Sequence, residues 1–342
     1  MLAYILKRIL LMLPTLLGAL TVTFVIIQFV PGGPVEQILS QARQRSASGV
    51  YRAQGDSDAQ QIERLKKLYG FDKPASVRYV EMLSAFARFD LGTSFQQNKP
   101  VAQLIREKLP VSVSLGLWSL LLTYLVSLPL GIAKAVRDGS AFDFATSLAV
   151  LVGFAIPGFV LGVLLIVLFA GGSFFDVFPL RGLVSENWDE LSWPARVADY
   201  FWHLTLPLVC LSIGSFATST FLTKNTFIEE MRKQYVLVAR AKGLSQRQVL
   251  WKHVFRNALI PIVTGFPGAF IGAFFSGALL IETLFSLDGL GLLGYEAILR
   301  RDYPVVLGSL YLFTLIGLVV KLVSDVAYTL VDPRVQFGAV GR

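Results

Sequence analysis

Six long apolar stretches dominate this sequence and leave few folds open to it. They cover residues 9–30, 109–133, 144–175, 204–223, 258–281 and 304–328, and only the last contains charged residues, Lys321 and Asp325. A bilayer core of about 30 Å is crossed by about 20 residues of helix. Because backbone polar groups in lipid must bond within the protein, helices are favoured. The sequence therefore predicts an all-α integral membrane protein with six transmembrane helices.

The charge content excludes an ordinary soluble domain. Only 16% of the residues are charged and 54% are hydrophobic, whereas soluble domains carry about 25% charged residues. The net charge of +8 could indicate a nucleic-acid partner, but much of the basic excess lies in one polar segment, 224–257, and beside the apolar stretches. Basic residues in short loops mark the cytoplasmic side of a membrane protein. We therefore expect contacts with lipid and none with nucleic acid.

The first apolar stretch has the outline of a signal peptide but not its details. It is longer than the roughly 7 to 15 apolar residues of such a peptide, and Pro-Gly-Gly-Pro at 31–34 stands where a cleavage site would be. We therefore expect a retained helix over 1–30 and an external insert over 31–108. Within the insert we expect a mobile loop at 40–60 and a helix at 76–89. The membrane core then covers 109–334, with a tail at 335–342.

The polar segment 224–257 contains signals for two helices of its own. Gly243 is the residue type that ends helices in the left-handed conformation. Ser245 followed by Gln248 is a capping box, which starts a second helix. A solvated linker is the alternative, but linkers rarely hold such signals in register with amphipathic helices. The segment is therefore predicted to form a basic helix-elbow-helix on the cytoplasmic side.

One set of residues in this segment resembles a known family. The set is Tyr235, Ala239, Arg240, Ala241, Lys242, Gly243, Leu244, Ser245, His253, Arg256 and Asn257. It is similar to the coupling loop of permease subunits in binding-protein-dependent ABC importers, specifically the dipeptide and oligopeptide group. A second match lies in two stretches, 281–285 and 301–304. The resemblance implies that these residues, with Gln248, dock into a groove on a cytoplasmic ATPase.

The resemblance also implies partners and a location. A permease of this family works with a second homologous permease, two cytoplasmic ATPases and an external peptide-binding protein, and it carries a peptide through the bacterial inner membrane. Because no G-x-x-x-x-G-K-[ST] motif occurs in the chain, ATP and Mg are expected on the partners, with no cofactor here. The basic short loops place both termini in the cytoplasm.

Some positions depart from the family pattern and affect what can be inferred. Ser286-Leu287-Asp288-Gly289 stands where relatives commonly have Ser-Trp-Pro-Gly, and Pro-Gly-Gly-Pro at 31–34 replaces Pro-Gly-Asp-Pro. These changes indicate a sub-branch that takes longer peptides or the peptide-nucleotide microcin C. Leu237 and Val238 occupy positions where the wider family has Glu-Ala. The docking contact is therefore expected to rest on Arg240, Lys242 and shape, with Ala239 and Ala241 letting the helix lie deep in the ATPase.

Five residues are candidates for the translocation path or its gate: Pro157, Phe159, Glu282, Lys321 and Asp325. Pro157 and Phe159 lie in a segment, Ala155-Ile156-Pro157-Gly158-Phe159, that resembles a family segment near the translocation path, although ordinary helix packing is the more common role of any single such residue. Lys321 and Asp325 lie four residues apart on one helix face, so they can neutralise one another. A charge at the bilayer centre costs at least about 2.5 kcal/mol, so we expect a structural pair near the inner end of the span, with gating as the alternative.

Other functional classes have weaker support in the sequence. A secondary transporter would need intramembrane ion-binding carboxylates, for which only Asp325 and Glu282 are available. An intramembrane enzyme would need paired catalytic groups, but Cys210 is alone and His203 and His253 are far apart, so no catalytic or metal residue is expected. A related permease for a non-peptide solute, such as a nickel chelate or an oligosaccharide, also stays open.

Overall fold

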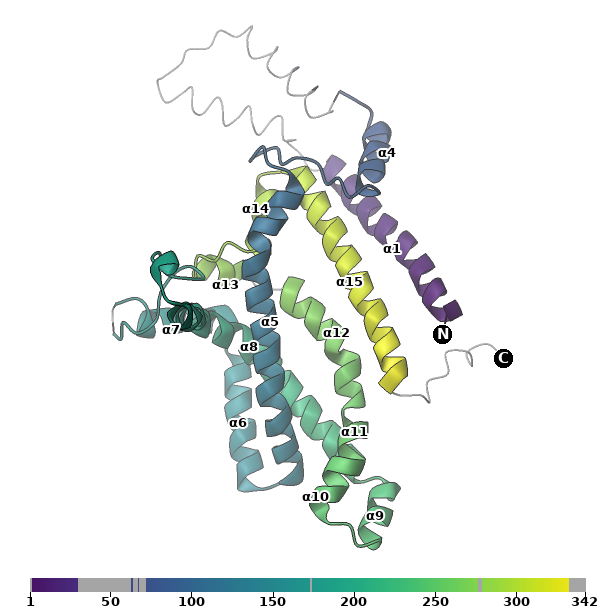
Figure 1. Cartoon of the computed structure of the whole chain (residues 1–342), viewed down its shortest axis with the longest axis vertical. Helices are drawn as coiled ribbons and strands as arrows, with labels where there is room; N and C mark the ends of the chain where they lie inside the picture. The colour runs from purple at the N-terminus through teal and green to yellow at the C-terminus, as the bar shows by residue number, and fades with distance from the viewer. Residues whose placement is uncertain are drawn as a thin grey trace. The chain divides into compact units, whose positions relative to one another are not determined.

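The structure, a computed structural model, describes residues 2–29, 63, 67, 72–172, 174–275 and 279–331. In these ranges the regular elements are helices, and one isolated bridge joins Thr93 to Pro100 (Figure 1). The main helices are α1 (Leu2–Phe29), α4 (Ala75–Phe86), α5 (Val101–Val136), α6 (Ala141–Ala155), α7 (Gly158–Phe169), α8 (Trp193–Met231), α9 (Gln234–Ala241), α10 (Gln246–Val249), α11 (Phe255–Ala258), α12 (Ile260–Phe275), α13 (Leu279–Leu284), α14 (Leu290–Leu299) and α15 (Tyr303–Val331). The predicted all-α class is confirmed.

The long apolar helices coincide with the predicted spans. By length and composition, five segments of the described chain can cross a membrane: Ile5–Phe29, Val101–Val136, Trp193–Met231, Ile260–Leu284, which holds α12 and α13, and Tyr303–Val326. The bent pair α6 and α7 raises the number to six if it counts as one span. The multi-pass membrane character predicted from the sequence is thus confirmed.

The predicted span over 144–175 is not one continuous helix. The chain breaks between α6 and α7, and the two helices meet at 93°. Ile156, the residue before Pro157, has an extended backbone with φ −89° and ψ 117°, as the steric demand of a following proline favours. By contrast, Pro129 and Pro267 lie inside α5 and α12 without ending them.

The chain divides into two compact units, of which the first contains residues 110–291 and 320–331 of the described chain. One of its apolar cores joins α5, α8 and α13 through Leu115, Leu204, Leu208, Ile281 and Phe285. A second core joins the end of α5 to the segment that follows α8. Helix α8 extends the predicted apolar stretch 204–223 at both ends, so Lys224 lies inside the helix rather than at the start of a loop.

The second unit contains residues 2–109 and 292–319. Helix α4 covers most of the predicted helix 76–89. Phe86 is buried, and the ring of Tyr79 lies 5.2 Å from that of Phe24 of α1 in a tilted arrangement. The helix ends early because Phe89 takes a left-handed backbone with φ 58°. Asp302 accepts hydrogen bonds from the hydroxyl of Ser94 and the backbone N–H of Phe95.

Several predicted features fall outside the described residues. These are the Pro-Gly-Gly-Pro motif at 31–34, the loop at 40–60, most of the insert up to residue 71, the Asp-Pro-Arg motif at 332–334 and the tail at 335–342.

Candidate functional site

The segment that follows α8 folds as the predicted helix-elbow-helix. α9 ends at Ala241, and α10 begins after Ser245, whose side chain caps the helix while Gln248 bonds back to the Ser245 N–H. The second helix continues through a π-helical stretch, Leu250–Val254, into α11. Figure 1 shows α9 beside α10 near the end of α8. The capping box and the elbow predicted from the sequence are confirmed, and residues 232–258, which follow α8, are called the coupling element below.

Gly243 gives the elbow its geometry. Its φ is +82°, a conformation that costs residues with a Cβ about 1 to 2 kcal/mol. The Gly243 N–H bonds to the Arg240 carbonyl at 2.9 Å, and the Leu244 N–H bonds to the Ala239 carbonyl at 3.3 Å. This pair of bonds is a Schellman motif. A Cβ at Gly243 would meet no atom within 4 Å, so backbone conformation, not space, selects glycine here.

Tyr235 joins the parts of the coupling element through its hydroxyl. It donates to Glu230 Oε1 at 2.7 Å, within the last turn of α8, and accepts from Asn257 Nδ2 at 3.3 Å. The carbonyl of His253 lies 3.3 Å from both the Tyr235 hydroxyl and Asn257 Nδ2. Burial raises the pKa of Tyr235 to about 12, so the hydroxyl stays protonated near neutral pH. Three residues selected by the resemblance, Tyr235, His253 and Asn257, thus meet at one point.

The coupling element has a buried face and an exposed face. Val236 and Ala239 of α9 pack with Val249, Val254 and Ala258, and with Ile132 and Ala135 at the end of α5. Leu237 and Val238 are half-exposed to solvent, at 54% and 51%, as is Trp251. Arg240, Ala241, Lys242 and Arg256 are also exposed. The exposed face therefore combines apolar and basic side chains.

The role predicted for Ala239 is wrong. Its side chain is 6% exposed and points into the core of the coupling element, so it cannot lie against a partner. The reason is helical periodicity, which puts positions 236 and 239 on the same face. Leu237 and Val238, in which sequence reasoning saw only a missing glutamate, occupy the outer face with Arg240 and Ala241.

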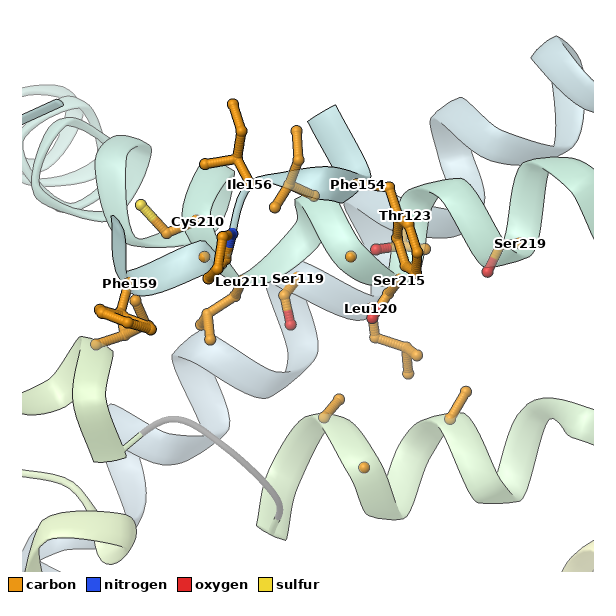
Figure 2. Close-up of a pocket in the computed structure, with 18 of the residues that line it drawn as sticks. Ser119, Leu120, Thr123, Phe154, Ile156, Phe159, Cys210, Leu211, Ser215 and Ser219 are labelled. Carbon is orange, nitrogen blue, oxygen red and sulfur yellow. The ribbon is translucent and has the colours of Figure 1, made fainter. Parts of the chain in front are cut away.

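A cavity of about 550 Å³ lies between helices of the first unit. Its lining comes from α5 (Ser119, Leu120, Thr123, Tyr124), the α6–α7 break (Phe154, Ile156, Pro157, Gly158, Phe159), α8 (Cys210, Leu211, Ile213, Gly214, Ser215, Ser219), α12 (Ala269, Gly272, Ala273) and α13 (Leu280, Ile281). Figure 2 shows Phe159 towards one end and Ser219 towards the other, with Ser119 between them. Pro157 and Phe159, predicted from the resemblance, are thus brought together here.

The described part of the cavity wall offers hydroxyls and small side chains but no formal charge. Ser119, Thr123, Tyr124, Ser215 and Ser219 supply hydroxyls, and among the described lining residues none is acidic, basic or histidine. Gly158 lets α7 approach α8, because a Cβ there would lie 2.6 Å from the Cys210 carbonyl oxygen. Such a wall can exchange hydrogen bonds with a neutral polar ligand such as a peptide main chain.

The other three path candidates do not line this cavity. Glu282 is fully buried, its carboxylate packs on the backbone of Gly289 and Gly291, and its Oε1 accepts a 3.4 Å bond from Ser112. Lys321 and Asp325 lie one turn apart on α15, the first exposed and the second half-buried. Their mutual neutralisation stays a prediction.

Sequence reasoning missed two groups of residues. One is the set of cavity serines on α5 and α8, Ser119, Ser215 and Ser219, which leaves no spacing signal because single serines are common in apolar helices. The other is an ion cluster of Lys134, Asp143 and Lys224, in which Asp143 lies 3.0 Å from Lys134 Nζ and 2.6 Å from Lys224 Nζ. The signal available was that each of these charges directly borders an apolar stretch.

Comparison with known proteins places the chain in a family. Residues 127–337, more than half of the chain, match the family model "Binding-protein-dependent transport system inner membrane component". The chain is 55% identical to the peptidoglycan transport system permease protein YejB of Agrobacterium fabrum, over 98% of each chain. It is 51% identical to the inner membrane ABC transporter permease protein YejB of Escherichia coli O157:H7, over 98% of this chain and 99% of that one.

More distant relatives agree with this placement. The chain is 32% identical to the oligopeptide transport system permease protein AppB of Bacillus subtilis, over 98% of this chain and 100% of that one. Among solved structures, an inward-facing MetNI methionine ABC transporter aligns with a TM-score of 0.51 and 18% identity, over 68% of this chain and 97% of that chain, which indicates a shared fold. The chain belongs to the family of inner membrane components of binding-protein-dependent transport systems, the permease subunits of ABC importers.

Proposed function

We propose that this chain is one permease subunit of an ATP-driven peptide importer and forms half of its translocation pathway. The relatives named as peptidoglycan, oligopeptide and dipeptide permeases support the peptide class. In this proposal the chain pairs with a second homologous permease, two cytoplasmic ATPases and an external peptide-binding protein. ATP and Mg bind to the ATPases, and both termini of this chain lie in the cytoplasm.

The observation that carries the proposal is the exposed face of the coupling element. Leu237, Val238 and Arg240 lie on α9, a short helix that Lys242 caps and whose inner face is fixed to the membrane helices through Val236. Buried apolar contacts supply most docking energy, and surrounding charges steer the approach. A groove on an ATPase that grips this face would move α9 and, through the shared core, the end of α5.

The cavity is the part of the pathway that this chain supplies. Carrying a peptide through hydrocarbon exposes many backbone N–H and C=O groups, each costing several kcal/mol if left without a partner. Hydroxyls on α8, such as those of Ser215 and Ser219, can replace water at these groups. Because the wall carries no formal charge, we expect peptides of different net charge to pass.

The substrate branch follows from the relatives and from the sequence. The name of the 55% identical relative includes peptidoglycan transport, which supports peptides derived from cell-wall material as substrates. Longer oligopeptides and microcin C remain the branch predicted from the departures at 31–34 and 286–289.

Reconstitution of the whole complex tests the proposed function. The chain would be produced with its partner permease, ATPases and binding protein, purified, and placed in liposomes with a labelled peptide. Uptake should require ATP on the side of the membrane where the ATPases lie, and it should stop when ATP is replaced by a non-hydrolysable analogue. Uptake by the purified chain alone, driven by a proton gradient, would contradict the proposal and favour a secondary transporter.

A further inference from the structure

The ion cluster of Lys134, Asp143 and Lys224 joins three helices of the first unit. Lys134 lies near the end of α5, Asp143 in the first turn of α6, and Lys224 in the last third of α8. The Asp143 carboxylate forms an ion pair with each lysine. Its Oδ1 lies 3.0 Å from Lys134 Nζ, and its Oδ2 lies 2.6 Å from Lys224 Nζ. Asp138, which is 44% exposed in its side chain, adds a contact of 3.0 Å to Lys224. The two lysines and two aspartates cancel in formal charge.

Lys134 is the most deeply placed member of the cluster. It is 0% exposed, and its Nζ donates to the Asp143 carbonyl at 2.9 Å, to Thr146 Oγ1 at 3.0 Å and to Ser147 Oγ at 2.7 Å. All three ammonium protons therefore have acceptors. The Asp143 carboxylate also accepts the Gly139 N–H at 3.2 Å, so the loop between α5 and α6 is bonded to the same group.

A contribution to folding stability does not by itself explain the cluster. Removing ions from water is costly, and apolar residues of similar volume at such positions often give the same or a higher stability. What a hydrogen-bonded cluster adds is a defined geometry between the elements that it joins. The elements here are α6 on one side and the pair α5 and α8 on the other.

The pair α5 and α8 is already in close backbone contact beside the cluster. A Cβ at Gly131 would lie 2.8 Å from the Thr220 carbonyl oxygen and 2.5 Å from Thr223 Cβ. The same two helix ends meet the coupling element, because Ile132 packs in its core and α8 ends two residues before α9 begins. α5, α8 and the coupling element are thus packed together, and Asp143 bonds α6 to them.

The opposite end of α6 reaches the cavity. The helix covers about 20 Å at 1.5 Å per residue, from Asp143 in its first turn to the break at Ile156 and Pro157 in the cavity wall. A rigid helix fixed at one end to the moving group carries that movement to its other end.

We propose that Asp143, Lys134 and Lys224 are positioning residues that transmit movement of the coupling element through α6 to the Pro157 break. The inference rests on the proposed function. The apolar core of the coupling element contains residues of α5 and α8 but none of α6. The ion cluster adds a link from α5 and α8 to α6. Loss of this link should leave the rate of ATP hydrolysis unchanged, while the Pro157 break moves less and less peptide is transported per ATP.

The test measures peptide transported per ATP hydrolysed in the reconstituted complex. Asp143→Asn keeps the shape and removes the charge, and Lys224→Met removes the second cation. Each should lower the ratio by at least about fivefold, the lower end of usual coupling between sites, while the ATPases still co-purify. Lys224→Arg keeps the charge and should restore the ratio to within about twofold of wild type, since less than a factor of two is below usual coupling.

Glu296→Gln is the matched control, because it removes a partly exposed carboxylate from an ion pair with Arg300 that lies outside the cluster, and it should leave the ratio unchanged. If Asp143→Asn does not accumulate, Lys224→Met decides alone. An unchanged ratio in Lys224→Met, or an equal fall of transport and hydrolysis, would overturn the proposal. If wild type transports no peptide or binds no ATPase, the proposed function itself fails, which is a distinct result.

Discussion

The Tyr235 hydroxyl donates a 2.7 Å hydrogen bond to Glu230, joining α9 to the last turn of α8 across the break at Arg232 and Lys233. Glu230 is 7% exposed, so this bond is made to a buried carboxylate. The same hydroxyl contacts Asn257, and one atom therefore fixes the entry and the exit of the coupling element. The rigidity of this element determines how a partner's movement reaches the membrane helices.

Tyr235→Phe removes this junction without changing side-chain volume. Hydrogen bonds to charged groups contribute about 1.5 to 3 kcal/mol, so we expect a loss of thermal stability in detergent of that order. Because burial raises the pKa of Tyr235 to about 12, the contribution should be complete below pH about 10 and be lost as the pH rises towards 12. Tyr295→Phe, at an exposed tyrosine, is the control. Equal melting temperatures of the two variants would show that the junction carries no stability.

Gly243→Val should disconnect ATP hydrolysis from transport. A β-branched residue at φ +82° costs about 1 to 3 kcal/mol, and the elbow is expected to relax and change the angle between α9 and α10. Peptide-stimulated ATP hydrolysis of the assembled complex should fall strongly while membrane insertion persists. Asn tolerates this conformation, so Gly243→Asn should retain most activity.

Gly172→Val is the control for Gly243→Val, because it introduces the same backbone strain outside the elbow. Gly172 has φ +67° and, like Gly243, open space where a Cβ would be, but it lies in the loop after α7. A similar loss of peptide-stimulated hydrolysis in both valine variants would mean that strain anywhere in the chain is enough, and the docking role of the elbow would then lack support.

Gly158→Ala tests the close contact of α7 with α8. The added Cβ would lie 2.6 Å from the Cys210 carbonyl oxygen, and backbone cannot yield as a side-chain end can. Overpacking of this kind costs about 1 to 3 kcal/mol, and the cavity wall should widen at the break. We expect slower peptide uptake with normal ATPase binding. Gly268→Ala on α12 has open space and should behave as wild type, and slow uptake by both variants would argue against the contact.

The sequence determined the parts of this structure that depend on local rules. Charge-free runs predicted the apolar helices, and Gly243 with the Ser245–Gln248 capping box predicted the elbow within a residue. The first signal lies in the composition of one continuous segment, and the second acts within a few residues of backbone, where capping groups satisfy the N–H and C=O groups left open at helix ends.

Features that depend on distant residues were not predictable in the same way. The 93° angle between α6 and α7 accompanies a close approach of Gly158 to the Cys210 carbonyl of α8, a contact that no local signal around Pro157 predicts. The inward orientation of Ala239 depends on which face of α9 packs against Ile132, a residue 107 positions earlier in the chain. The link of Lys134 to Asp143 and Lys224 joins three helices, and a sequence shows only that each charge borders an apolar run.

A charge placed in the cavity wall should select among peptides. Ser215 lines the cavity on α8 and is exposed, so Asp or Lys there can be accommodated. Two unit charges 4 Å apart interact by about 4 kcal/mol at an effective dielectric of 20. A change of about 1 kcal/mol in the barrier to peptide passage already alters the uptake rate severalfold. Ser215→Asp should slow uptake of anionic peptides relative to cationic ones, and Ser215→Lys should do the reverse. Ser215→Asn, which is polar and neutral, should keep the wild-type ratio. The measurement is uptake of matched peptides that differ only in net charge by the reconstituted complex, at saturating binding protein. If the ratio is the same in Asp and Lys variants, peptides do not pass this wall, and the pathway must be sought elsewhere on the chain.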